Sequence, residues 1–208
     1  MTSFRVILVR HGETAWNRER RFQGWRDIPL SAEGRLQAEK TARALVACGA
    51  AAVYTSPLAR ARETAEIVAK PHRLGVTADE AFKEMSFGVW ESLTVDEARA
   101  AFPALYHAWR EAPHTVRFDG GEDLATAAAR AVAGLARLRE AHGGGTVVLV
   151  SHGIIVRLIV LDALGLGVER LRAVHATPAG ITEIEYRPGW ATVHRMNTLS
   201  HLEQVLDP

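Results

Sequence analysis

The chain has 208 residues, 48% of them apolar, which is enough to bury a continuous core and excludes disordered and fibrous proteins. Its 25 basic and 24 acidic side chains leave a formal net charge of +1 at pH 7, so no net field draws it towards nucleic acid or an anionic membrane. A single cysteine, Cys48, excludes a disulfide framework and any cysteine-based zinc or iron–sulfur site.

Apolar runs of strand length alternate with segments of helical period in the first third of the chain. Residues 6–9 form the first run, and a helix is expected from the capping Ser31 to Gly49. Residues 51–54 form a second run, followed by a helix that opens near Pro57 and ends before Pro71. This order predicts strands that are joined by helices and therefore run parallel.

Residues 74–121 are less regular and rich in aromatic side chains. The sequence "TVDE" at 94–97 predicts a capping box for a short helix. We expect this segment to be an insertion over the sheet.

The last part of the chain returns to alternating strands and helices. It predicts a helix at 124–142, a strand at 147–150, a helix at about 154–164 and a hairpin of strands at 181–186 and 191–196. The whole pattern predicts one α/β domain over residues 1–208, with a mainly parallel sheet covered by helices on both faces and an antiparallel edge hairpin.

Two strands end in the same unusual way. The sequence "VILVRHGE" places Arg10 and His11 just after the first strand, and "VVLVSHGI" places His152 just after another, each histidine followed by glycine. The ends of parallel strands form the ligand crevice of such sheets. Arg60 lies in the turn after the second strand, and arginine forks match phosphate geometry. Two arginines beside two histidines therefore predict a site for a tetrahedral dianion.

Five spaced segments carry a resemblance to a known family. They are "LVRHGETAWN" at 8–17, "FQGWRDIPLSAEG" at 22–34, "SPLARARETA" at 56–65, "EMSFGVWE" at 84–91 and "VSHG" at 150–153. Together, and in this order, they resemble the histidine phosphatase superfamily, the phosphoglycerate mutase-like proteins. The resemblance implies a three-layer α/β/α sandwich and phosphoryl transfer through a phosphohistidine, without metal or other cofactor.

The resemblance also implies roles for particular residues. His11 matches the nucleophile that takes the phosphoryl group, and Arg10, Arg60 and His152 match the residues that grip its oxygens. Asn17 matches a further side chain of the phosphate pocket. Nearby guanidinium groups should lower the pKa of His11 and keep its attacking nitrogen neutral.

Glu84 matches the position of the family's proton donor, with Glu91 as the fallback. We expect substrate contacts also from Gln23, Gly24 and Gly153. The family usually has glycine where this chain has Ser92, so the turn at this position departs from the pattern.

The aromatic side chains near the pocket are further candidates to contact an apolar or sugar-like leaving group. They are Phe22, Trp25, Phe87, Trp90 and Trp109.

Three functions fit this pocket. A phosphoglycerate mutase must hold a bisphosphate intermediate with extra cations, and the "ERHYG"-like block and paired-arginine insertion that provide them are absent. A non-catalytic phospho-ligand binder would have lost His11 or Arg60. The sequence therefore favours a metal-independent phosphatase acting on small phosphate monoesters, and leaves its physiological substrate open.

The expected partner is a small phosphate monoester, not nucleic acid or a membrane. No apolar run reaches the roughly 18 residues that span a membrane, and the N-terminus lacks signal-peptide architecture. We therefore expect a cytoplasmic protein, and we leave open whether it forms a homodimer.

Overall fold

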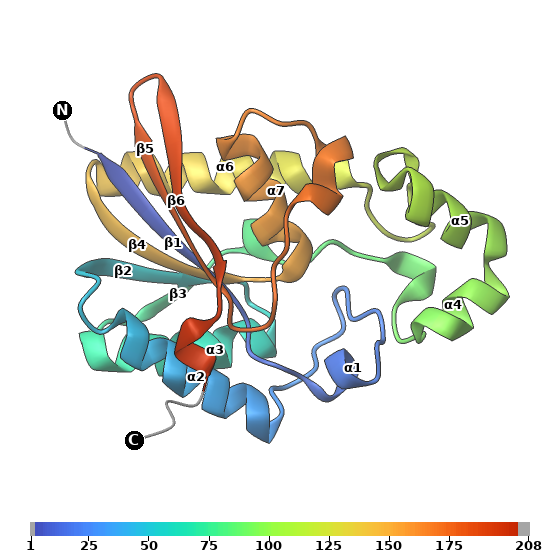
Figure 1. The fold of residues 1–208 in the computed structure, drawn as a ribbon, viewed down its shortest axis with the longest axis horizontal. Helices are drawn as coiled ribbons and strands as arrows, with labels where there is room; N and C mark the ends of the chain where they lie inside the picture. The colour runs from blue at the N-terminus through green and yellow to red at the C-terminus, as the bar shows by residue number, and fades with distance from the viewer. Residues whose placement is uncertain (1–2, 204–208) are drawn as a thin grey trace.

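A six-stranded sheet with the order β3-β2-β4-β1-β5-β6 is the centre of the computed structural model, which describes residues 3–203 (Figure 1). Strands β1 to β4 are mutually parallel, whereas β5 runs antiparallel to both β1 and β6. The strands are β1 (Phe4–Arg10), β2 (Ala50–Thr55), β3 (Val76–Ala78), β4 (Gly145–Ser151), β5 (Ile181–Arg187) and β6 (Trp190–Thr198). The predicted parallel sheet with an antiparallel edge hairpin is confirmed.

Helices cover both faces of this sheet. One layer contains α2 (Ala32–Leu45) and α3 (Ala59–Ala69), and the other contains α6 (Leu124–His142) and α7 (Gly153–Ala163). The sequence decides which residues face which layer, because neighbouring side chains of a strand point to opposite faces.

Strand β1 shows this alternation. Its Ile7 and Val9 pack with the buried residues of α2 and α3, whereas Val6 and Leu8 pack with those of α6 and α7. The three-layer α/β/α arrangement is therefore as predicted, and the central strands are apolar on both sides.

The segment at 74–121 is only in part an insertion. Its first residues form β3, which pairs with β2 and extends the sheet. The rest contains α4 (Val95–Ala101) and α5 (Pro103–Glu111), and it projects beyond the end of the sheet (Figure 1). With three residues, β3 is too short to show the alternation that identifies a strand.

Short helices complete the structure. They are α1 (Ala15–Arg18) and the 3₁₀ helices η1 (Lys70–His72), η2 (Glu80–Phe82), η3 (Gly88–Trp90), η4 (Pro113–Thr115), η5 (Val168–Ala173) and η6 (Ser200–Leu202). Among residues 3–203 there is no helix both long and apolar enough to cross a membrane.

The predicted helix caps are present. The Ser31 hydroxyl accepts a hydrogen bond from the Gly34 amide at 3.0 Å and starts α2. At α4, the Thr94 hydroxyl accepts from the Glu97 amide at 3.1 Å, and the Glu97 carboxylate accepts from the Thr94 amide at 2.7 Å. These bonds satisfy amide groups that a helix N-terminus leaves free.

Ser92 has a φ of +80°, in the left-handed region of backbone conformation. A side chain is strained there, and glycine is not. The turn therefore has the backbone conformation that glycine favours, although this chain has serine at the position.

Candidate active site

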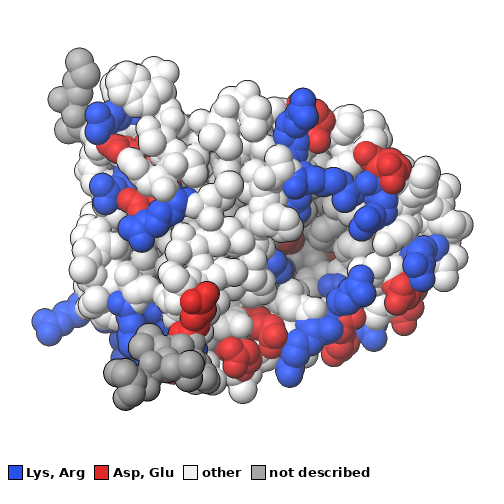
Figure 2. All heavy atoms as spheres, in the orientation of Figure 1, with Lys and Arg blue, Asp and Glu red and all other residues white. Residues whose placement is uncertain are grey.

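A pocket of about 350 Å³ opens where β1 and β4 end. Figure 2 shows it as a hollow right of centre, with basic side chains around its rim. Its lining residues are Arg10, His11, Asn17, Arg21, Phe22, Gln23, Gly24, Arg60, Glu84, Phe87, Gly153, Ile154, Arg157, His175 and Ala176.

His11 lies at the bottom of the pocket, directly after β1, and only 2% of its surface is exposed. Its Nδ1 lies 2.7 Å from the carbonyl oxygen of Gly12. A carbonyl can only accept, so Nδ1 carries the proton of the neutral ring and Nε2 keeps its lone pair. This tautomer is the one that a nucleophilic Nε2 requires.

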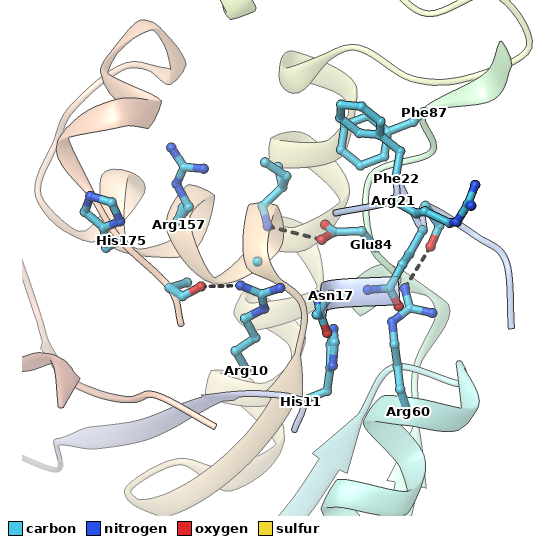
Figure 3. A pocket seen from close by; sticks show the side chains of 15 residues that line it. Arg10, His11, Asn17, Arg21, Phe22, Arg60, Glu84, Phe87, Arg157 and His175 are labelled. Atoms are coloured by element: carbon cyan, nitrogen blue, oxygen red, sulfur yellow. Dashed lines mark hydrogen bonds between the residues drawn. The ribbon is translucent and has the colours of Figure 1, made fainter. Parts of the chain in front are cut away.

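Arg10 and Arg60 flank His11 and are held by carbonyl groups (Figure 3). Arg10 donates to the Ala176 oxygen at 2.6 Å, and Arg60 donates to the oxygens of Gly24 and Arg26 at 2.8 Å each. Among the described residues, no carboxylate lies within ion-pair distance of either guanidinium. The carbonyl groups therefore fix both side chains without neutralising them, which suits a dianionic ligand.

This environment sets the charge of His11. Burial, and then the positive charges of Arg60 and Arg10, hold the pKa of His11 well below its usual value. Burial also lowers the pKa of Arg60, to about 10, which leaves it protonated at neutral pH. At neutral pH, the site thus combines a neutral imidazole with charged guanidinium groups.

His152 lies behind the pocket surface rather than on it. It is fully buried, and its ring centroid lies 5.1 Å from that of His11. Its Nε2 lies 2.7 Å from the Ser56 hydroxyl, which itself accepts from the Leu58 amide. The hydroxyl can therefore donate its proton to Nε2, which leaves the proton of the neutral ring on Nδ1, an atom without a hydrogen-bond partner among residues 3–203.

Glu84 is 9% exposed and lies in the pocket wall beside the first turn of α7. One carboxylate oxygen accepts from the Met85 amide at 2.9 Å, and the other accepts from the Ile154 amide at 3.3 Å. Both bonds orient the carboxyl group. The fallback residue, Glu91, is not among the pocket residues and instead accepts from the Trp25 amide at 2.9 Å.

Asn17 and Gln23 line the pocket as well. The Asn17 side-chain oxygen is bound to the Thr14 amide at 3.0 Å, so its amide nitrogen is left to face a ligand. Gln23 is buried, and its side-chain oxygen has no partner among residues 3–203.

Two glycines, Gly24 and Gly153, line the pocket near the arginines. Gly24 has a φ of +50°, and a Cβ there would lie 2.1 Å from a Glu91 oxygen. A Cβ on Gly153 would lie 3.4 Å from the Arg10 guanidinium carbon, which is ordinary contact. Gly24 is thus required by the local geometry, whereas Gly153 leaves room beside Arg10.

Of the five aromatic candidates, Phe22 and Phe87 line the pocket. Trp90 is a core residue and Trp109 packs against the core, and neither lines the pocket. Trp25 donates its indole N–H to the Glu84 carbonyl at 2.7 Å. The sequence could not separate these groups, because all are aromatic and close together in the chain.

Sequence reasoning missed three cationic or titratable residues of the pocket: Arg21, Arg157 and His175. Arg157 follows His152 by five positions, so it lies on the second turn of a helix whose first turn reaches the pocket. This spacing was the available signal. His175 lies in the irregular segment before β5, and its position in the sequence gave no such signal.

Within residues 3–203, no group of three His, Cys, Asp or Glu side chains is arranged to hold a metal ion.

Comparison with known proteins identifies the family. Residues 6–199 match the histidine phosphatase superfamily, branch 1. Phosphoserine phosphatase 1 of Hydrogenobacter thermophilus is 32% identical over 198 residues, which cover 95% of this chain and 94% of the relative. A probable phosphoglycerate mutase GpmB of Salmonella paratyphi C is 33% identical with the same coverage. The solved structure of Bacillus stearothermophilus YhfR has a TM-score of 0.91 and 34% identity, and the match covers 96% of this chain and 100% of that one. The chain therefore belongs to the histidine phosphatase superfamily, branch 1.

Proposed function

We propose that this protein is a phosphoric monoester hydrolase that acts on small phosphate monoesters through a phosphohistidine at His11. One observation carries the proposal. A neutral imidazole with a free Nε2 lies at the bottom of the pocket, between two guanidinium groups that form no ion pair within residues 3–203. This is what attack on a phosphate dianion needs.

In the first step, the Nε2 lone pair of His11 forms a bond to phosphorus while the bond from phosphorus to the ester oxygen breaks. Glu84, in its carboxylic acid form, gives its proton to the leaving oxygen. In the second step, Glu84 takes a proton from water, whose oxygen attacks the phosphohistidine and frees inorganic phosphate and His11.

The other residues hold the phosphoryl group. Arg10 and Arg60 bind its oxygens, and His152, buried beside His11 behind the pocket surface, supports the nucleophile from beneath. Catalysis of phosphoryl transfer is mostly positioning and stabilisation of charge on these oxygens. Asn17 and Gln23 supply neutral donors.

The glycines at 24 and 153 complete the phosphate-binding surface. The Gly24 carbonyl accepts a hydrogen bond from Arg60 at 2.8 Å, and a Cβ at Gly153 would be in ordinary contact with the Arg10 guanidinium group. We propose that both act by letting the backbone approach the bound phosphate.

A mutase is the second candidate, because one relative carries that name at 33% identity. A mutase has to hold a bisphosphate and keep water from the phosphohistidine. The loop at 85–93 has no basic residue, and its pocket-lining member is Phe87. This favours transfer to water.

The test is an assay of p-nitrophenyl phosphate and alkyl phosphates with EDTA present, beside 3-phosphoglycerate with catalytic 2,3-bisphosphoglycerate. We expect steady phosphate release that EDTA does not change, with little 2-phosphoglycerate. Efficient isomerisation without net phosphate release would establish the mutase instead, and loss of activity in EDTA would contradict a metal-independent reaction.

We further propose that one domain, residues 1–208, carries this activity in the cytoplasm, on a small-molecule substrate rather than on nucleic acid or a membrane. Size-exclusion chromatography with light scattering decides between a monomer and a homodimer.

A further inference from the structure

Residues 84–87, which carry the proposed proton donor Glu84 into the pocket, form neither helix nor strand (Figure 3). Hydrogen bonds from other parts of the chain must therefore fix the backbone of this segment. A general acid works only within hydrogen-bond reach of the oxygen that it protonates. The groups that hold residues 84–87 thus bear on the proposed reaction.

Arg130 on α6 holds the segment from one side. Its Nη1 donates to the carbonyl oxygens of Ala81 at 2.9 Å and Lys83 at 2.7 Å, and its Nη2 donates to that of Glu84 at 2.8 Å. Its Nε and Nη2 also donate to the two carboxylate oxygens of Glu122, at 2.8 and 2.9 Å. These five bonds use all five N–H groups of the guanidinium group, so Arg130 has no donor left for a substrate.

Glu122 holds the segment just after Glu84. Its carboxylate accepts from the Ser86 amide at 2.9 Å, and its own amide donates to the Ser86 carbonyl at 3.0 Å. The side chains of Arg130 and Glu122 are only 21% and 12% exposed, and a two-pronged pair of this kind is specific in its geometry. The ion pair therefore holds the backbone on both sides of Glu84.

The position of this backbone decides where the Glu84 carboxyl group lies. The Glu84 carbonyl oxygen accepts from Arg130 and also from the Trp25 indole N–H at 2.7 Å, so both of its lone pairs are used. The carboxyl group is bound to α7 by the Ile154 amide at 3.3 Å, a long bond that a small shift of the backbone would break. A change at Arg130 therefore moves the carboxyl group relative to a bound phosphate.

Resting on the proposed phosphatase function, we propose that Arg130 and Glu122 are positioning residues that hold Glu84 within reach of the leaving oxygen. Neither residue lines the pocket, so the pair acts through Glu84 and not on the substrate. A displacement of about 1 Å at a reacting group can cost about 10²-fold in rate. Loss of the pair should therefore impair the step that Glu84 performs, protonation of the leaving group.

Single-turnover release of the leaving alcohol, with saturating excess enzyme, measures this step alone. The two substrates are glycerol 1-phosphate, whose alkoxide needs a proton, and p-nitrophenyl phosphate, whose aryl oxide leaves with little help. We expect Arg130→Gln to slow the first substrate about 10- to 10²-fold and the second far less. The enzyme concentration that gives half the maximal rate should not change, because Arg130 does not touch the substrate.

Arg137→Gln is the matched control. Arg137 lies on the same helix and pairs with Asp79 at 2.8 Å, so the same substitution removes an ion pair of α6 without altering the bonds to Glu84. Both rates should stay as in the unaltered protein.

Milder variants keep the test decisive if Arg130→Gln folds poorly. Arg130→Lys retains the charge without the planar fork, and Glu122→Gln retains one acceptor oxygen, so both should lower the alkyl-to-aryl ratio of rates by a smaller factor. In a Glu84→Gln background, Arg130→Gln should lower this ratio no further, because the group that it positions is already gone.

A ratio unchanged by Arg130→Gln, equal losses on both substrates, or a further fall of the ratio in the Glu84→Gln background would overturn the positioning role. The phosphatase function would survive any of these results as long as the unaltered protein hydrolyses p-nitrophenyl phosphate. Failure of the unaltered protein to do so would contradict the proposed function, and the positioning role with it.

Discussion

Arg60 shows how one side chain determines both the shape and the charge of the site. It is fully buried on α3, and two carbonyl groups, not carboxylates, hold its fork. Phosphate chemistry predicted from the sequence that Arg60 binds the phosphoryl group. Its carbonyl partners could not be predicted, because they come from the loop at 24–26 and depend on tertiary structure. Arg157 was missed for the same reason, because its place in the pocket depends on where α7 and η5 meet.

Replacement of Arg60 by lysine should therefore reduce kcat about 10²- to 10³-fold, since the charge remains but the two-pronged donor is lost. Steady-state kinetics on p-nitrophenyl phosphate measures this. Arg62→Lys, an exposed neighbour on the same helix, is the control and should change little. A raised KM with unchanged kcat would assign Arg60 to substrate capture alone.

Glu84→Gln should slow alkyl phosphates by about 10²-fold or more and activated aryl phosphates far less, because only an alkyl alkoxide needs a proton as it leaves. The measurement is the ratio of kcat on the two substrate types. Glu91→Gln, which alters a carboxyl group outside the pocket, should keep the ratio of the unaltered protein. Equal losses on both substrates for Glu84→Gln would move the proton-transfer role elsewhere.

At the scale of elements, the sequence predicted what short-range patterns encode. The strands β1, β2 and β4, the cap of α2 and the capping box of α4 follow from apolar runs and hydrogen-bonding side chains. The short strand β3 and helix α5 were not predicted. Pairing with β2 stabilises β3, and Pro103 in the first turn of α5 was the overlooked signal of a helix start.

Replacement of Ser92 by glycine tests whether the backbone of this turn is strained. Ser92→Gly should raise the free energy of unfolding by about 0.5–1 kcal/mol, because glycine relieves the left-handed conformation but loses more entropy on folding. Urea unfolding measures it. Ser92→Ala removes the hydroxyl and keeps the strain, so Ser92→Gly must be the more stable of the two, and the reverse order would show that the turn is not strained.

For the whole molecule, the two buried histidines link stability to pH. Burial holds the pKa values of His11 and His152 well below their usual value in the folded protein. As the pH falls below about 6.5, the unfolded chain takes up protons that the folded chain cannot, so stability is lost until the pH reaches the lowered pKa. The fold that creates the site thus weakens on mild acidification.

Between pH 7 and 5.5 we expect the free energy of unfolding to fall because of these two groups. Urea titrations at both pH values measure it. His11→Asn should lose less over this range than the unaltered protein, and His114→Asn, at an exposed position, should behave as the unaltered protein does. A loss that is the same in all three proteins would show that the fold does not lower the pKa of His11.

Trapping of the covalent intermediate tests the central claim most directly. A substrate labelled with ³²P is mixed with excess enzyme in the presence of EDTA, and the reaction is stopped with alkali within one turnover. The modified residue is then located by peptide mass spectrometry. We predict phosphate on His11, in a bond that is stable in base and labile in acid, and none in His11→Asn, which should also lose turnover. Steady turnover with no phosphate on His11, or a His11→Asn protein that keeps a tenth of the activity, would contradict the account.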